Sequence, residues 1–194
     1  MQPTENTLGS KTWLAAKLTV LWFLLGILSL GLLIGPATAA FYKIMFHVNH
    51  TDRIPQKPVH QYFRSIKHTL KDGILVFILA VALFALIYYL YTLATSTWQY
   101  VLVYFIGFEA LIVTLYTFPI LALFKANNIF IHIKTAFLLA NLHAFSSLLL
   151  VFMIGVMVLA SFLYSPITLI FLILPYLFGS ATVFHRVLSF YIKT

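Results

Sequence analysis

Residues 73–118 contain two long apolar runs that decide the fold: 73-GILVFILAVALFALIYYLYTL-93 and 98-WQYVLVYFIGFEALIVTLYTF-118. Each run has about the 20 residues that an α-helix needs to cross the hydrocarbon core of a bilayer. The connection around Thr95–Thr97 carries no charge and is too short to be more than a turn. This stretch therefore predicts a transmembrane helical hairpin.

Three further apolar runs have a similar length and cover residues 13–34, 142–163 and 167–187. The whole chain of 194 residues is 62% hydrophobic and 8% charged, with a mean hydropathy of +1.02. A soluble domain usually has about a quarter of its residues charged. We therefore expect an all-α polytopic membrane protein with five transmembrane helices in a single domain. The first run lacks a basic segment ahead of it, so we interpret it as a retained span and not as a signal peptide.

The twelve cationic residues lie in the breaks between the apolar runs. Two of them, Lys11 and Lys17, belong to the N-terminal flank, and ten flank the opposite ends of the runs. These ten are Lys43, Arg53, Lys57, Arg64, Lys67, Lys71, Lys125, Lys134, Arg186 and Lys193. Because cytoplasmic flanks are enriched in Lys and Arg, the pattern predicts that residues 36–72 and the C-terminus are cytoplasmic and that the N-terminus is outside. It also explains the net charge of +8 without nucleic acid as a partner.

The long segment 36–72 carries an amphipathic pattern. From Pro58 onward its apolar residues recur at helical spacing, with polar residues on the other face. The pattern predicts an interfacial helix on the inner leaflet or on a partner, with Tyr62, Phe63, Arg64 and Lys67 among its residues. Ala37–Val48 is expected to form a second interfacial helix.

Glu109 is the one acidic residue within a predicted span and would lie near the middle of the bilayer. Such a residue is either a proton or substrate site, or a protonated carboxyl hydrogen-bonded between helices. The two interpretations have about equal weight here. Lys17 is the obvious counter-ion by charge, but its side chain can reach the membrane surface, so a Lys17–Glu109 pair is disfavoured.

Other chemistry has little support in the sequence. His47 and His50 have a spacing that can chelate a metal, but no third ligand accompanies them, so we expect no metal site. The chain has no cysteine and no phosphate-binding loop of the type Gly-x-x-x-x-Gly-Lys-[Ser/Thr]. The sequence therefore predicts neither an enzyme nor a bound cofactor.

Three motifs resemble the YesL family of small bacterial membrane proteins. They are Gly35-Pro36-Ala37-Thr38-Ala39-Ala40, Tyr62-Phe63-Arg64, and Phe118-Pro119 with the residues that follow it. The resemblance implies a multi-pass protein of the bacterial cell membrane whose family lacks an assigned function and accompanies carbohydrate ABC importers. It thus implies an accessory subunit that contacts the importer's permease subunits and membrane lipids.

The small residues of the first motif allow close contact between helices in lipid. That contact is either with the permease or within this chain. A stand-alone oligomeric secondary transporter or channel that uses Glu109 is the alternative function, because transporters build their sites from interrupted helices near the bilayer midplane. A regulator acting through the basic cytoplasmic segment is a third hypothesis.

Overall fold

The structure is a computed structural model that describes residues 8–124, 128–165 and 168–192, and within them the chain forms seven helices and no strand. The helices are α1 (Leu8–Leu28), α2 (Ile34–Thr51), α3 (Pro58–Leu93), α4 (Thr97–Leu123), α5 (Ile129–Leu142), α6 (Ala144–Leu163) and α7 (Thr168–Ile192). Lys125, Ile167 and Lys193 lie outside the described residues. The predicted all-α class is confirmed for the described part of the chain.

Five of these helices, or parts of them, are long and apolar enough to cross a membrane, which agrees with the predicted number of spans. They are Leu8–Leu28, Pro58–Leu93, Thr97–Leu123, Ala144–Leu163 and Phe171–Ser189. Most of their apolar surface is not covered by the rest of the chain, since at most a third of each candidate span is buried. Exposed apolar helices of this length are typical of a multi-pass membrane protein.

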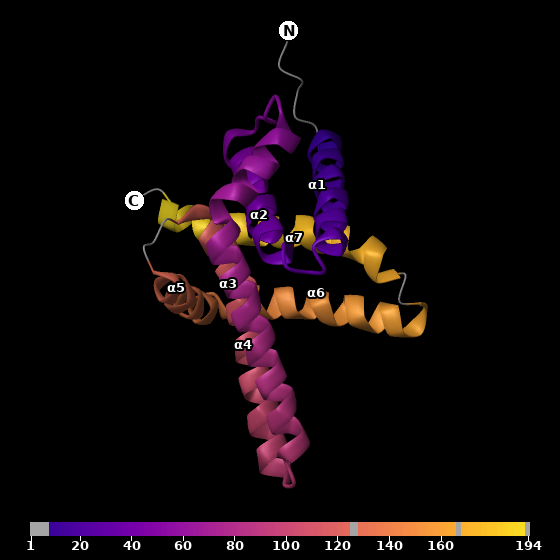
Figure 1. Cartoon of the computed structure of the whole chain (residues 1–194), viewed down its shortest axis with the longest axis vertical. Coiled ribbons are helices and arrows are strands. Elements are labelled where there is room, and N and C mark those ends of the chain that lie inside the picture. The colour runs from indigo at the N-terminus through magenta and orange to yellow at the C-terminus, as the bar shows by residue number, and fades with distance from the viewer. Residues whose placement is uncertain (1–7, 125–127, 166–167, 193–194) are drawn as a thin grey trace.

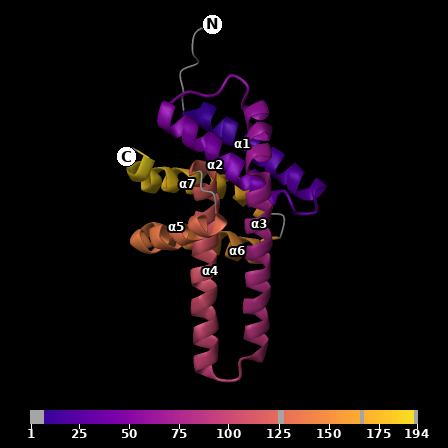
Figure 2. The ribbon, with the colours of Figure 1, turned by 60° about the vertical axis from the view of Figure 1, so that its left-hand side comes forward.

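Helices α3 and α4 form the predicted hairpin, which extends well beyond the rest of the molecule (Figures 1 and 2). At its tip Ser96 caps α4: its hydroxyl accepts a hydrogen bond from the Gln99 backbone N–H at 3.4 Å, and the Gln99 side chain accepts one from the Ser96 N–H at 3.1 Å. This reciprocal pair satisfies two otherwise free donors of the first helical turn. The tight turn at residues 94–96 is thereby stabilised.

One difference from the sequence prediction concerns the start of α3. The amphipathic helix expected from Pro58 and the span expected at 73–93 are one uninterrupted helix of 36 residues. No proline follows Pro58 within α3, and Gly73 leaves the helix unbroken. At 1.5 Å per residue such a helix is about 54 Å long, so it extends beyond the thickness of a hydrocarbon core.

A second difference concerns the first span, predicted at 13–34. Helix α1 ends at Leu28, and the chain reverses at Leu30 and Gly31, whose φ angles of 51° and 91° are left-handed. Because glycine adopts a positive φ without steric strain, Gly31 is suited to this turn. Helix α2 then returns along α1, so the two form a second hairpin with an exposed tip at which Leu30 is 95% exposed.

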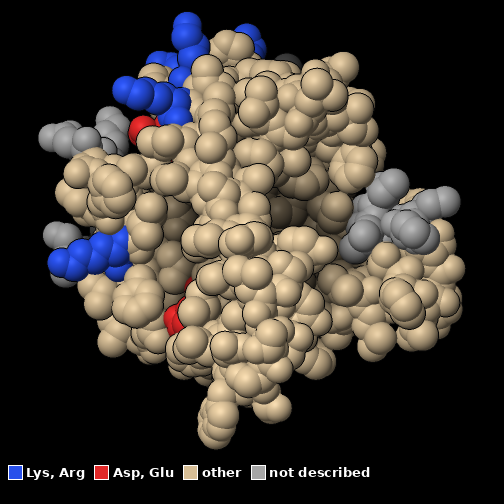
Figure 3. Space-filling model, turned by 60° about the horizontal axis from the view of Figure 1, so that its bottom comes forward, with Lys and Arg blue, Asp and Glu red and all other residues tan. Residues whose placement is uncertain are grey.

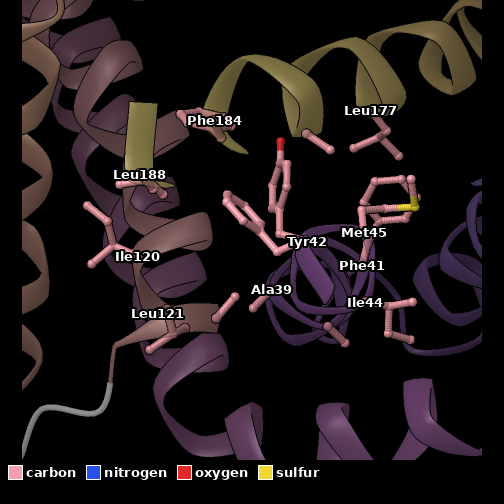
Figure 4. Packing of buried hydrophobic residues seen from close by; sticks show 14 of the residues in the cluster. Ala39, Phe41, Tyr42, Ile44, Met45, Ile120, Leu121, Leu177, Phe184 and Leu188 are labelled. Carbon is pink, nitrogen blue, oxygen red and sulfur yellow. The ribbon is translucent and has the colours of Figure 1, made fainter. Parts of the chain in front are cut away.

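Helix α2 is the centre of the molecule and not the interfacial helix that the sequence predicts for Ala37–Val48. Twelve of its 18 residues are buried, and it contacts α1, α3, α4 and α7. Figure 4 shows it in end-on view, with Phe41, Tyr42 and Met45 pointing toward α7. The Tyr42 hydroxyl and the Ser180 hydroxyl on α7 are hydrogen-bonded at 2.9 Å.

The third hairpin, α6–α7, runs across the α3–α4 hairpin in both ribbon views (Figures 1 and 2). The two hairpins therefore do not share an axis. A flat bilayer crossed by α3 and α4 along their length would hold α6 and α7 at a shallow angle to its surface. The short helix α5, which the sequence analysis did not predict, connects α4 to α6.

Candidate functional site

The motif Gly35-Pro36-Ala37-Thr38-Ala39-Ala40 lies inside the protein, where each of its residues is buried. A Cβ atom added to Gly35 would collide with the backbone carbonyl oxygen of Gly73 on α3. Conversely, a Cβ on Gly73 would lie 2.8 Å from the Pro36 backbone. The small residues thus allow α2 and α3 to approach within backbone contact, so they are not available to a partner protein.

The second motif reinforces the same contact from α3. Tyr62 is fully buried, and its hydroxyl donates a hydrogen bond to the Ala37 carbonyl oxygen at 3.2 Å. Its neighbours Phe63, Arg64 and Lys67 are exposed. All four of these residues were expected on an interfacial surface, but Tyr62 is instead buried and joins α3 to α2. In the third motif Pro119 is buried and Phe118 half-buried on α4, which continues through the proline to Leu123.

An ion pair conflicts with the predicted separation of the N-terminus from residues 36–72. The Lys11 ammonium donates a hydrogen bond of 2.6 Å to the Asp52 carboxylate, the only salt bridge within residues 8–124, 128–165 and 168–192. Lys11 was expected outside the cell and residues 36–72 inside, yet this contact brings Lys11 next to Asp52. The physical reason is the reversal at Leu30 and Gly31, which returns the chain to its starting side before α3 begins. The Lys11 ammonium lowers the pKa of the Asp52 carboxyl.

Glu109 is half-buried on α4 and lines a cavity of about 140 Å³ between α4, α5 and α6. Asn141 and Ser147 are the other polar residues of that cavity. Lys17 lies elsewhere, with its ammonium 5.1 Å from the ring centre of Trp13. The disfavoured Lys17–Glu109 pair is therefore not formed, and Glu109 faces neutral polar side chains.

The outer surface of the α3–α4 hairpin is apolar, aromatic and uncovered. Figure 3 shows this face mostly without charged side chains: Lys and Arg lie at its upper left and left margins, and two small acidic patches are visible on its left side. The most exposed large residues of the hairpin, each at least half exposed, are Val81, Leu86, Tyr88, Tyr89, Leu93, Trp98, Val101, Leu102, Tyr104 and Phe105. Such a surface requires lipid or another apolar helix as its neighbour.

Two cavities adjoin at Lys43 on α2. The first, which we call the histidine cavity, has a volume of about 360 Å³, and its polar lining consists of Lys43, His47, His50, Gln61, Ser65, His185 and Ser189. The second has about 460 Å³ and is lined by Lys43, His68, Thr69, Asp72, His132 and apolar residues of α4. Ala122 and Leu123 at the end of α4 line both cavities.

Five of the seven histidines of the chain therefore line these two adjoining cavities. They come from α2, α3, α5 and α7, so the sequence offered no signal for the cluster beyond the spacing of His47 and His50. No group of three or more metal-binding side chains is arranged to hold a metal ion in the described part of the chain. Desolvation lowers the pKa of His132, and this effect is opposed by the nearby Asp72 carboxylate.

Comparison with known proteins gives one match. A family model described as "Protein of unknown function, DUF624" matches residues 15–91, which include most of α1, all of α2 and nearly all of α3. YesL-like proteins belong to this family, so the match supports the resemblance over that range. No curated protein and no solved structure matches the chain. The matched range contains the α2–α3 contact and most of the polar residues around Lys43, which are the parts of this chain most similar to a known family.

Proposed function

We propose that this chain is an accessory subunit of a carbohydrate ABC importer in a bacterial cell membrane and that it acts through helix–helix contacts with the permease. The observation that supports this function best is the α3–α4 hairpin, whose apolar outer surface no other helix of the described chain covers. The resemblance to the YesL family supplies the class of partner.

The chemistry of the hairpin fits a helix pair that meets other helices in lipid. Tyr91 contacts Tyr100 and Tyr104 near the tip, with ring centres 5.4 and 5.9 Å apart. Trp98 is 83% exposed beside them. Aromatic residues of this kind gather where a membrane meets water, so the tip marks one membrane surface. The flanks between this belt and Gly73 offer large apolar side chains for van der Waals contact with a second helix pair.

We place the cation-bearing end in the cytoplasm, including the N-terminal end of α1. The α1–α2 and α3–α4 hairpins each return the chain to the side from which it came, and Lys11 thereby lies beside Asp52 in the basic segment 36–72. This orientation fits the distribution of Lys and Arg better than the predicted external N-terminus. Because the chain has no cysteine, the orientation can be tested with the single-cysteine variants Lys11→Cys, Arg53→Cys and Ser96→Cys. We expect a membrane-impermeant maleimide to label only Ser96→Cys in intact cells; labelling of Lys11→Cys would contradict the orientation.

The partner proposal is tested by purifying tagged protein in mild detergent and identifying the bound proteins by mass spectrometry. The double variant Leu102→Ala/Phe105→Ala removes exposed side chains from the hairpin. As a matched control, Phe152→Ala/Leu159→Ala removes equally exposed side chains from α6. We expect permease subunits with the wild type and the α6 control, and their loss with the hairpin variant. A wild-type preparation without transporter subunits refutes the proposal.

A transporter or channel is the second candidate, and the cavity at Glu109 favours it. A half-buried carboxyl beside Asn141 and Ser147 on three adjacent helices is an arrangement that can form part of a substrate or ion site. Reconstituted wild-type protein should then carry a flux that Glu109→Gln abolishes. The absence of flux in both proteins would exclude this function, and equal flux in both would exclude a role of Glu109 in it.

A further inference from the structure

We infer that the histidine cavity, between α2, α3, α4 and α7, is a binding site for a phosphate group. This site is separate from the hairpin surface on which the proposed function rests. Its volume of about 360 Å³ lies in the range of about 300–1,000 Å³ that is typical of small-molecule pockets. Its polar lining determines what it can bind.

Every polar side chain that lines the histidine cavity can donate a hydrogen bond. The lining holds one lysine, three histidines, two serines and one glutamine, and no carboxylate. Lysine has donors only, and histidine, serine and glutamine each offer at least one N–H or O–H group. Donors that converge from several helices favour an anion with several acceptor oxygens, and a phosphate group has that chemistry.

His185 provides the most direct evidence. Its Nε2 atom is one of two buried side-chain nitrogen or oxygen atoms without a hydrogen-bond partner in the described residues. The Phe46 ring, 5.6 Å from the imidazole between ring centres, packs beside it and holds its position. Buried polar atoms without a partner are rare, because desolvation without a compensating hydrogen bond is unfavourable. Because this atom has almost no accessible surface, a ligand oxygen in the cavity would satisfy it once the imidazole turns toward the cavity.

The surrounding charges also favour an anion. Asp52 is the acidic residue whose charge acts on His185, and Lys11 compensates that charge at 2.6 Å. Asp72 lines the second cavity together with Lys43 but forms no salt bridge with it within the described residues. The positive charge of Lys43 is therefore available to a ligand, and the same charge disfavours a metal cation.

The position of the cavity relative to the membrane leaves two possible sources for the phosphate group. Gln61 and Ser65 of α3 line it, and they precede Gly73, where the apolar run begins, by roughly 12–18 Å at 1.5 Å per residue. The cavity thus lies beyond the hydrocarbon core, at the level of lipid headgroups or of the adjacent water. The phosphate belongs either to an anionic lipid or to a soluble phosphate ester.

The test uses purified full-length protein with two probes. Inorganic phosphate is titrated calorimetrically into protein in a neutral detergent. Retention of phosphatidylglycerol is measured by native mass spectrometry after release from nanodiscs that contain equal amounts of phosphatidylglycerol and phosphatidylcholine. The variants Lys43→Met and His185→Gln remove a charge and a buried imidazole from the cavity. Lys57→Met and His60→Gln are matched controls on exposed positions that line neither cavity.

We expect the wild type and both controls to bind at least one probe. We expect Lys43→Met to weaken that binding about tenfold or more, as the loss of a charge-assisted hydrogen bond would, with a smaller loss in His185→Gln. Binding of phosphate identifies a soluble ligand, and selective retention of phosphatidylglycerol alone identifies a lipid.

The inference is overturned if neither probe binds the wild type, or if the controls lose as much binding as the cavity variants. Thermal unfolding of each variant in the same detergent distinguishes the loss of the site from the loss of the fold. We expect His185→Gln to fold because glutamine is similar to histidine in size and polarity. None of these measurements requires a transporter partner, so their failure is distinguishable from failure of the proposed function.

Discussion

Helix α2 and the α3–α4 hairpin are both rich in apolar residues, but their surroundings are opposite. Phe41, Tyr42 and Met45 of α2 are at most 2% exposed, while Leu102 and Phe105 of α4 are about 60% exposed. Helix α2 also carries Lys43, His47 and His50, so it is the more polar of the two. In this chain, therefore, the most hydrophobic segments face outward and a moderately polar helix forms the core, as lipid-exposed proteins allow.

The largest effect expected from this comparison is on the stability of α2. Phe41→Ala removes a fully buried ring and should lower the free energy of unfolding by about 3–5 kcal/mol. The matched variant Phe105→Ala removes an exposed ring from the hairpin and should change it by no more than about 0.5 kcal/mol. Unfolding in mixed micelles with increasing dodecyl sulfate measures both. Equal losses would remove the distinction between the two regions.

A comparable test concerns the contact of α2 with α3. Gly35→Val places side-chain atoms against the Gly73 backbone, and such overpacking should destabilise the protein by about 3 kcal/mol. Gly155 on α6 has no atom within 4 Å of an added Cβ, so Gly155→Val is the control and should unfold like the wild type. If the two variants prove equally stable, α2 and α3 do not approach as closely as described.

A smaller effect is expected at Tyr42, whose hydrogen bond to Ser180 joins α2 to α7. Tyr42→Phe should lower stability by about 1 kcal/mol at neutral pH. Burial raises the pKa of Tyr42 from 10.0 to about 12. Between pH 10 and 12 the folded state therefore retains the Tyr42 proton that the unfolded state releases. The contribution of Tyr42 to stability is fully present below pH 10 and is lost as the pH rises toward 12. Between pH 10 and 12 the wild type should lose more stability than Tyr42→Phe; parallel pH profiles would contradict this assignment.

The smallest effect belongs to the exposed ion pair of Lys11 and Asp52. Asp52→Asn should lower the midpoint of thermal unfolding slightly at low ionic strength and leave it unchanged at high salt, since exposed pairs are screened. The Lys11 ammonium lowers the pKa of Asp52, so any contribution is present above pH 3.8 and is lost as the pH falls through the lowered value. If the unfolding midpoints of the wild type and Asp52→Asn still differ in high salt, Asp52 stabilises the protein through more than its ion pair with Lys11.

The sequence predicted the positions of the helices along the chain better than the contacts between them. Runs of about 20 apolar residues predict the candidate spans, because length and hydropathy are local properties. The burial of α2 was missed for a physical reason. Its interspersed Lys43, His47 and His50 resemble the polar face of an interfacial helix, whereas in the folded chain these residues line cavities between helices.

The orientation of the N-terminus and the histidine cluster depend on tertiary structure. A run continuing to Ile34 predicts a crossing, but Leu30 and Gly31 reverse the chain within that run. A glycine among apolar residues is common in transmembrane helices, so this turn has no distinctive sequence signal. Likewise His185 is more than 130 residues from His50 in the chain, a separation at which spacing carries no information about contact.

The unbroken course of α3 has a mechanical consequence. One half of this helix lies in the hairpin, and the other carries Gln61 and Ser65 on the wall of the histidine cavity. A continuous helix transmits a displacement along its whole length, and the Gly35–Gly73 contact with α2 lies near its middle. A displacement of the hairpin that leaves α3 straight therefore also displaces Gln61 and Ser65 on the cavity wall. The contacts of α2 with Tyr62 and Gly73 oppose this displacement.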